Sequence, residues 1–379
     1  MTIQPDSAFG HLVQAWCMRP SHLAKRGVMW NVRLMCLALL VIAIHAKAQT
    51  STTSMSGSIS ESGSTSSHVP SGTKYSCALT TPGAAQCLGN IGIAKIAAGT
   101  NHTCALTIAG GAQCWGRSSE GQTNVPPALT SGGLTSITVG NFHTCGVTTS
   151  GAVKCWGNNG EGQITVPPAF ASGGVASLSA GAYHTCALTI VGAVQCWGRS
   201  SDGQTAVPVV LTRGGIAFIS AGEHHTCALT TAGAMQCWGR LNEGQITVPP
   251  AFASDGVALM SAGAYHTCAL TTAGAVQCWG GATDGQITVP PALTSGGVAS
   301  ISTGGYHTCA VTTAGAVQCW GRSNEGQIAV PPALASGGVA SIFAGGYHTC
   351  VLTTAGAAQC WGISIDGKST IPPPLLRLQ

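Results

Sequence analysis

Charge is scarce in this chain of 379 residues, because only 7% of them are Asp, Glu, Lys or Arg. Basic residues outnumber acidic ones by 15 to 11, but five bases and a single acid, Asp6, lie within residues 1–48. The remainder carries ten of each sign and is formally neutral. A neutral surface gives no electrostatic footprint for nucleic acid or an anionic membrane. We therefore expect neither as a partner.

Signals for catalysis are also missing. We find no serine-hydrolase elbow, no His-Glu-x-x-His helix and no unique pair of carboxylates. We also expect no phosphate-binding loop, and the Asp-Gly-Gln loops do not have the spacing of calcium ligands. The sequence therefore predicts a protein without enzymatic activity, cofactor or metal.

The longest apolar run near the amino terminus is short. Residues 34–44 are apolar, Arg33 precedes them, and Ala46-Lys47-Ala48 follows them. This order is typical of a secretory signal, and the run is too short to cross a bilayer comfortably. We predict a signal peptide over residues 1–48, in which residues 1–28 are a candidate gene-model extension before Met29. A membrane anchor and an accidental apolar run are the alternatives.

The next segment, residues 49–73, is rich in Ser, Thr and Gly and reads as a flexible linker. Export and the cysteines discussed below predict a secreted protein or one at the cell surface or in the periplasm. We assign the remaining residues, 74–379, to one repeat domain.

What the chain has in abundance is glycine, with 53 residues, and cysteine, with 18. Pairs of cysteines ten positions apart recur with one constant period, from Cys104 and Cys114 to Cys350 and Cys360. An extra pair, Cys77 and Cys87, precedes the first full unit at a shorter spacing. A period of about 40 residues indicates a propeller, a solenoid or another repeat array.

Propensity separates these architectures. The unit at 298–338 shows no useful helical periodicity but four strand-like runs, VASIST, HTCAVT, AVQCW and GQIAV, separated by turn residues. Four antiparallel strands in a unit of this length correspond to one propeller blade. We therefore predict an all-β protein with a β-propeller of seven four-stranded blades. Eight blades are the alternative, because the segment 75–89 is an additional hairpin.

The spacing of the cysteines follows from the hairpin HTCALTTAGAVQCWG at 266–280. A three-residue loop ending at Gly274 pairs Leu270 with Val276 and Cys268 with Cys278. Opposed residues on neighbouring strands lie near disulfide range. Reduced cysteines and a zinc site that includes His266 are the alternatives. The predicted disulfides are Cys77–Cys87, Cys104–Cys114, Cys145–Cys155, Cys186–Cys196, Cys227–Cys237, Cys268–Cys278, Cys309–Cys319 and Cys350–Cys360.

The His before each first cysteine and the Trp after each second one recur in all seven full units, as His266 and Trp279 do in one of them. A catalytic group is usually unique in a chain, whereas a packing group repeats with the blade. We therefore interpret both as structural residues, with the Trp packing between blades.

The string G-x-x-H-T-C-A-L-T-T-x-G-A-V-Q-C-W-G-x-x-x-x-G-Q resembles the repeat of the regulator of chromosome condensation family, over residues 74–371. The resemblance implies a seven-bladed β-propeller. Members of that family act as exchange factors for the small GTPase Ran, as inhibitors of β-lactamase and as ectodomains of plant receptor kinases, and they share a protein-binding ring. The full units here are all equal in length, so no insertion supplies the wedge of the exchange factors. The cysteine-rich form looks like the extracellular members.

Strand direction places the turns before the His and the loops after the Trp-Gly pair on one rim. Tyr and Arg, which often anchor protein interfaces, vary between units there. The expected binding residues are Phe142, Tyr183, His224, Tyr265, Tyr306, Tyr347, Arg117, Arg199, Arg240 and Arg322. The opposite rim is nearly uniform among the units and suggests scaffold. The structural alternative is that each Tyr only packs its turn.

These observations predict a monomeric, secreted or surface β-propeller that binds an unidentified protein through this rim. A multivalent glycan-binding propeller is the alternative, in which Tyr and Trp stack on sugars and avidity compensates for weak single sites. An exchange factor for a GTPase is the least favoured of the three functions.

Overall fold

The computed structural model describes residues 75–80, 84–89 and 92–372, and side chains from residue 92 onward. The predicted signal peptide (1–48) and linker (49–73) lie outside the described residues and stay predictions. Within the described part of the chain, no helix has the length and hydropathy needed to cross a membrane.

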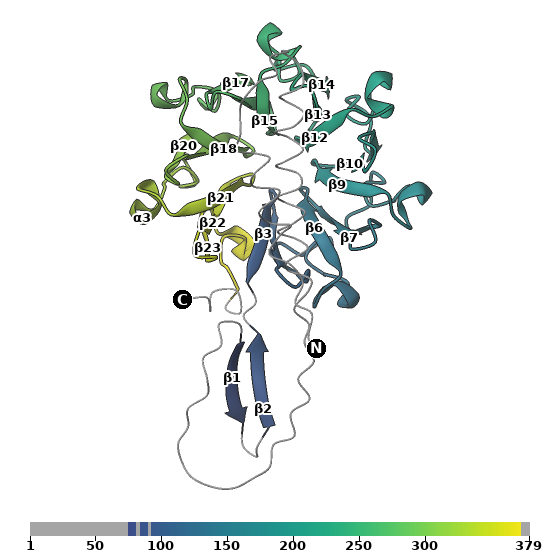
Figure 1. The fold of residues 1–379 in the computed structure, drawn as a ribbon, viewed down its shortest axis with the longest axis vertical. Coiled ribbons are helices and arrows are strands. Elements are labelled where there is room, and N and C mark those ends of the chain that lie inside the picture. Colours follow the sequence, from purple (N-terminus) through teal and green to yellow (C-terminus); the bar gives the residue numbers. More distant parts are fainter. Residues whose placement is uncertain (1–74, 81–83, 90–91, 373–379) are drawn as a thin grey trace, which may run out of the picture. The chain divides into compact units, whose positions relative to one another are not determined.

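The repeat domain consists of seven antiparallel sheets of three strands each, which Figure 1 shows around a common centre. In chain order the sheets are β3 (Ile93–Ala98), β4 (His102–Thr107) and β5 (Ala112–Gly116); β6 (Leu134–Val139), β7 (His143–Thr148) and β8 (Val153–Gly157); β9 (Val175–Ala180), β10 (His184–Thr189) and β11 (Val194–Gly198); β12 (Ile216–Ala221), β13 (His225–Thr230) and β14 (Met235–Gly239); β15 (Val257–Ala262), β16 (His266–Thr271) and β17 (Val276–Gly280); β18 (Val298–Thr303), β19 (His307–Thr312) and β20 (Val317–Gly321); β21 (Val339–Ala344), β22 (His348–Thr353) and β23 (Ala358–Gly362). We number these sheets one to seven.

The expected fourth strand of each blade does not form in the described residues. The run GQIAV at 326–330 is a turn, because Gly326 has a φ of +73° and the Ala329 N–H donates back to its carbonyl at 3.0 Å. The prolines that follow lack an N–H for a sheet ladder and instead begin a short helical turn. These turns are η1 (Pro127–Leu129), η2 (Pro168–Phe170), η3 (Val209–Thr212), η4 (Pro250–Phe252), η5 (Pro291–Leu293) and α3 (Pro332–Ala335).

The ring closes from the seventh sheet to the first. Strand β22 contacts β3, and the Gly346 N–H donates to the Gly99 carbonyl at 3.2 Å. β1 (Tyr75–Thr80) and β2 (Ala84–Gly89) form a separate two-stranded hairpin. The ring of described sheets therefore has seven members rather than the eight of the alternative.

Apolar side chains fill each space between neighbouring sheets. Trp238 of the fourth sheet, for example, packs with Leu188 and Val194 of the third and with Leu211 of η3. Fully burying one such aliphatic side chain stabilises the fold by about 1.5–3 kcal/mol relative to its exposure. The repeated Trp thus packs between neighbouring sheets, as expected. Leu211 of η3 completes this interface in place of a fourth strand.

The register of the cysteine hairpin agrees with the prediction. Leu270 lies opposite Val276 and Cys268 opposite Cys278, and Gly274 has a φ of +81°. Seven disulfides form in this way, with Cα–Cα distances of 4.0–4.1 Å. Cys77 is opposite Cys87 in the β1–β2 register, but their side chains are outside the described residues, so that disulfide stays a prediction.

Candidate functional site

The polar rim consists of the turns between the first and second strands of each sheet and the loops that follow the third strands. A backbone hydrogen bond joins the two segments in every sheet, such as the one from the Arg199 N–H to the Tyr183 carbonyl at 2.9 Å. In the sixth sheet the equivalent bond runs from the Arg322 N–H to the Tyr306 carbonyl at 3.0 Å. The sequence prediction that these two segments share one rim is therefore confirmed for the described sheets.

Charge gathers on this rim. Residues 92–372 contain 17 charged residues, and 13 of them lie on the polar rim. They are Arg117, Arg199, Arg240, Arg322, Lys368, Glu120, Glu161, Asp202, Glu223, Glu243, Asp284, Glu325 and Asp366. The rim thus has a formal excess of acids, although the domain as a whole is nearly neutral.

The rim aromatics form a crescent of neighbouring rings, in which some pairs are stacked and others tilted. Phe142 and Tyr183 have ring centroids 5.4 Å apart. A second run continues from His224 through Tyr265 and Tyr306 to Tyr347, with centroid separations of 6.0, 5.8 and 5.5 Å. All six rings are half-buried. Since each ring is fixed by its neighbours, little conformational freedom would be lost when a partner binds.

Three rim arginines lie over these rings. The Arg199 guanidinium is 5.8 Å from the Tyr183 centroid, and that of Arg322 is 5.2 Å from Tyr306. Arg240 lies 5.6 Å from the ring of Tyr265 in the next sheet. Arg117 is the exception, because it is exposed and its own turn carries Asn101 instead of an aromatic residue.

Acidic residues pair with the same arginines. Arg322 Nη2 donates to Glu325 Oε1 at 2.9 Å, and looser pairs join Arg199 to Asp202 at 3.8 Å and Arg240 to Glu243 at 4.0 Å. Such half-exposed pairs contribute little to the free energy of unfolding, because water screens them. The main effect of these pairs is to restrain the orientation of each guanidinium over its ring.

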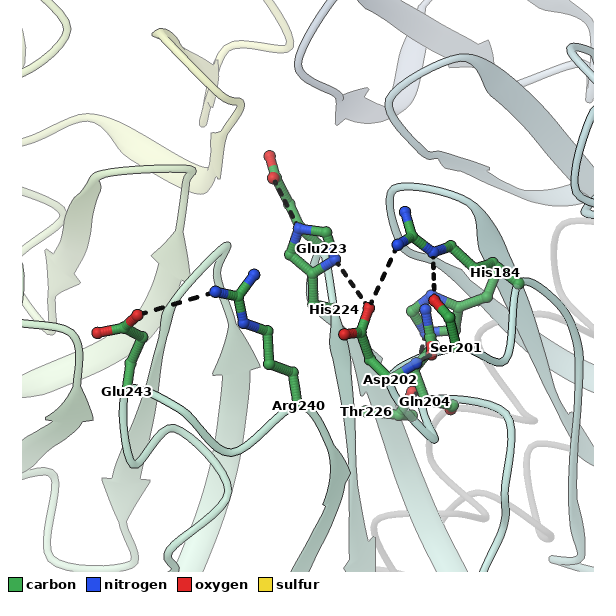
Figure 2. Close-up of polar contacts among 10 residues, drawn as sticks. His184, Ser201, Asp202, Gln204, Glu223, His224, Thr226, Arg240 and Glu243 are labelled. Atoms are coloured by element: carbon green, nitrogen blue, oxygen red, sulfur yellow. Dashed lines mark hydrogen bonds and ion pairs between the residues drawn. The ribbon is translucent and has the colours of Figure 1, made fainter.

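The fourth sheet departs from the others at the rim, where its turn reads Glu223-His224 (Figure 2). His224 Nδ1 is 3.5 Å from Asp202 Oδ2, and its Nε2 is 4.0 Å from Glu223 Oε2. Burial lowers the pKa of His224, while the charges of Glu223 and Asp202 act in the opposite direction. This turn is the most polar part of the crescent.

A small cavity of about 80 Å³ lies inside the ring of turns. Its walls are mainly Gly and Ala, and its polar side chains include Thr100, Asn141 and Glu223. Thr100 Oγ1 lies 2.7 Å from Asn141 Oδ1 and 3.3 Å from Glu223 Oε1, which belongs to the fourth sheet. Glu223 therefore extends across the cavity toward the first sheet.

The repeated histidines are structural, as expected. His184 is fully buried, and its Nε2 lies 2.9 Å from Thr226 Oγ1 of the next sheet. Thr226 donates its only hydroxyl hydrogen to the Gln204 carbonyl at 3.1 Å, so Nε2 of the histidine must carry the donated N–H. Burial lowers the pKa of His184 to about 3. These rings are neutral at pH 7 and unavailable to a substrate.

Residues 362–369 read GISIDGKS, which fits the letter pattern of a phosphate-binding loop and was not expected above. Such a loop lies between a strand and a helix, but here only the short turn η6 (Ile365–Gly367) forms. Lys368 is buried, and its carbonyl accepts hydrogen bonds from Thr103 and Trp115 of the first sheet at 3.0 Å. This segment closes the ring rather than cradling a phosphate.

The opposite rim is less uniform than its sequence suggested. Four of its residues near the third sheet are large, apolar and 64–74% exposed: Ile190, Val191, Val209 and Val210. The corresponding residues of the second unit are Thr149, Ser150, Pro168 and Ala169. A comparison of single units against the repeat consensus could have found them.

Taken together, a closed ring of seven sheets with its polar groups gathered on one rim defines a β-propeller. The sequence matches the regulator of chromosome condensation (RCC1) repeat at residues 93–122, 134–163, 175–204, 216–245, 257–286, 298–327 and 339–367. The chain belongs to this repeat family.

Solved structures agree with this assignment. The ectodomain of the receptor kinase CR4 from Physcomitrella patens is 27% identical with a TM-score of 0.57, over 72% of this chain and 74% of that one. The ectodomain of the receptor kinase ACR4 from Arabidopsis thaliana is 26% identical with a TM-score of 0.55, over 72% of this chain and 98% of that one. Prp20p from Saccharomyces cerevisiae, at 18% identity, shares the fold with a TM-score of 0.53 over 67% and 80% of the chains. A comparison with curated proteins gave no match.

Proposed function

We propose that this protein is a secreted or cell-surface propeller that binds another protein through the polar rim and has no enzymatic activity. The observation that carries the proposal is the crescent of neighbouring aromatic rings with arginines over them, such as Arg322 over Tyr306 and Tyr347. Tyr and Arg are enriched among the residues that dominate binding energy at protein interfaces. Their restraint before binding lowers the entropic cost of association.

Packing of the rings favours a protein over a glycan. A sugar stacks on an open aromatic face, but Tyr306 has neighbouring rings on two sides, at 5.8 and 5.5 Å, and a guanidinium at 5.2 Å. The crescent combines half-buried rings with phenol hydroxyls and charged groups. Such a surface suits the mixed polar and apolar chemistry of a protein partner.

The disulfides support an extracellular setting. Seven cross-strand bridges would be reduced in a cytosol but persist outside the cell or in a periplasm. Two receptor-kinase ectodomains at 26–27% identity have the same fold. We therefore place the partner in an oxidising compartment and do not favour a cytosolic GTPase.

Crosslinking mass spectrometry on the mature chain in the extracellular fraction of its native host tests the proposal. Crosslinks to one protein should concentrate on the loops around Arg199, Arg240 and Arg322. Affinity for that protein should fall about 30-fold in the double variant Tyr306→Ala/Arg322→Ala, as expected for the loss of one interface anchor.

Arg213→Ala is the matched control, because Arg213 is an exposed arginine outside the polar rim. Equal loss in the control and the rim variant, or crosslinks confined to the opposite rim, would contradict the proposal. Binding of the wild-type protein on a glycan array, abolished by Tyr306→Ala, would replace it with the glycan alternative.

A further inference from the structure

Glu223 is a single carboxylate at the inner edge of the polar rim. The same position in the other six turns is taken by Thr100, Asn141, Ala182, Ala264, Gly305 and Gly346. Since Ala and Gly suffice there in four sheets, the fold does not require an acid at this place. The charge of Glu223 therefore calls for an explanation other than stability.

The surroundings of Glu223 leave its charge without a strong cationic partner among the described residues. Its Oε1 lies 3.3 Å from the Thr100 hydroxyl across the cavity, and its Oε2 is 4.0 Å from His224 Nε2. Figure 2 shows its carboxylate pointing away from Asp202 and Arg240. The side chain keeps 20% of its surface exposed. A half-buried carboxylate at an opening, with no Lys or Arg paired to it among the described residues, is a favourable place for an incoming cation.

Aromatic groups and a cavity accompany this carboxylate. Burial, with a hydrogen bond to Tyr347, raises the pKa of Tyr306, and the Glu223 charge contributes, so the phenol stays neutral. The rings of Tyr265, Tyr306 and Tyr347 line up along this side of the rim. The cavity of about 80 Å³ beside Glu223 has small Gly and Ala walls. Neutral tyrosine rings on the same rim as this carboxylate suit a compact organic cation.

The molecule already binds one ammonium on this rim. Lys368 Nζ donates to the Thr100 carbonyl at 3.2 Å and lies 5.7 Å from the centroid of the Tyr347 ring. The carboxylate whose charge acts on Lys368 is that of Asp366, two positions earlier in the chain. An ammonium thus lies against a backbone carbonyl and a tyrosine ring on the side of the first and seventh sheets, although burial lowers the pKa of Lys368. Glu223 faces the cavity from the fourth sheet.

We propose that the mouth of this cavity binds the ammonium of a lysine side chain from the partner, with Glu223 as its counter-ion and the rim tyrosines beside its stem. The inference rests on the proposed protein-binding function and names the group that the rim recognises. A lysine fits because its compact ammonium ends a flexible apolar stem of four carbons. A calcium ion would need about six to eight oxygen ligands, whereas Glu223, Thr100 and Asn141 supply three side chains.

An NMR titration of the mature chain with Nα-acetyl-L-lysine amide tests this assignment. The amide signals of Thr100, Glu223 and Gly305 should shift in a saturable way, and the shifts should weaken as salt rises. Glu223→Ala copies the residue found at Ala264 and should retain the fold. It should weaken lysine binding about tenfold or more, as expected for the loss of a charge-assisted hydrogen bond.

Glu243→Ala is the matched control, because Glu243 is a rim acid that already pairs with Arg240. It should leave lysine binding unchanged, and Nα,Nε-diacetyl-lysine amide should not bind the wild-type protein. No saturable shift with lysine amide, equal binding by Glu223→Ala, or binding of L-alanine amide instead would overturn the proposal. If Glu223→Ala keeps full affinity for the partner while Tyr306→Ala/Arg322→Ala loses it, this inference fails and the proposed function stands.

Discussion

His348 Nε2 lies 2.8 Å from Thr103 Oγ1, a residue 245 positions earlier in the chain. This contact joins the seventh sheet to the first. Every other repeated histidine makes the same contact with the threonine of the following sheet, as His102 does with Thr144 at 2.7 Å. Seven such bonds run once around the described ring. The propeller is thus closed by the same interaction that joins its internal sheets.

Thr103→Val should destabilise the protein by about 1–3 kcal/mol, because it leaves the buried N–H of His348 without an acceptor. Thr226→Val should cost a similar amount at an internal junction, since its histidine contact is equivalent. Urea unfolding of both variants measures the free energies. The exposed Thr354→Val is the control and should be nearly neutral. A normal Thr103→Val protein beside a weakened Thr226→Val protein would mean that the ring is open in solution.

Acid should unfold the protein through these histidines. Burial lowers the pKa of His266 to about 3 and that of His143 to about 4, whereas an unfolded histidine titrates near 6.5. Between these values the unfolded chain binds more protons, so stability falls as pH drops from about 6.5 toward about 3. Each histidine adds a slope of about 1.4 kcal/mol per pH unit in the middle of that window.

Denaturant unfolding at pH 7, 6, 5 and 4 measures this dependence. His266→Gln should show a shallower slope than the wild-type protein, because one proton uptake is removed. His224→Gln should change the slope less, because His224 is partly exposed, lies outside the histidine–threonine ring, and has Glu223 and Asp202 opposing the lowering of its pKa. A free energy of unfolding that stays constant from pH 7 to pH 4 would show that these rings are not held neutral.

The sequence predicted the features that depend on local pairing. The register of Cys268 with Cys278 follows from one turn glycine and strand alternation, and the constant repeat period places that hairpin in every sheet. The prediction of a fourth strand was wrong. Strand propensity favours Ile and Val there, but the turn at Gly326 and the prolines that follow determine the backbone conformation. The cross-ring contact of Thr100 with Glu223, 123 positions apart, depends on closure and could not be read from any single unit.

Each disulfide should stabilise its hairpin, and its two sulfurs should differ in how readily a reductant reaches them. Each joins cysteines with a sequence separation of 10, which corresponds to about 2–3 kcal/mol in the chain-entropy treatment. Cys268 is fully buried and Cys278 only partly, so a reductant reaches the second sulfur first. Cys268→Ala/Cys278→Ala should lower the free energy of unfolding by about that amount.

Intact mass after alkylation in denaturant, without reductant, counts the free thiols, including buried ones. We expect no alkylated cysteine in a mature chain that begins at Gln49, because all eight pairs, including the predicted Cys77–Cys87, are closed. Thiols that react without reductant would contradict the cross-strand pairing. An uncleaved chain with many free thiols would also remove the support for an extracellular site of action.

The glycines of the inner turns set how closely the sheets approach the centre. A Cβ at Gly263 would lie 2.6 Å from both the Gly304 carbonyl oxygen and Cε1 of His266. Gly263→Ala should therefore destabilise the ring by about 1–3 kcal/mol through overpacking, because the first of these neighbours is backbone. Gly160→Ala is the matched control, since its nearest neighbour is a side-chain oxygen at 3.4 Å. Thermal unfolding of the two variants measures the difference. If Gly263→Ala melts like Gly160→Ala, the sheets have room to move apart, and the cavity at Glu223 is wider in solution than its glycine walls indicate.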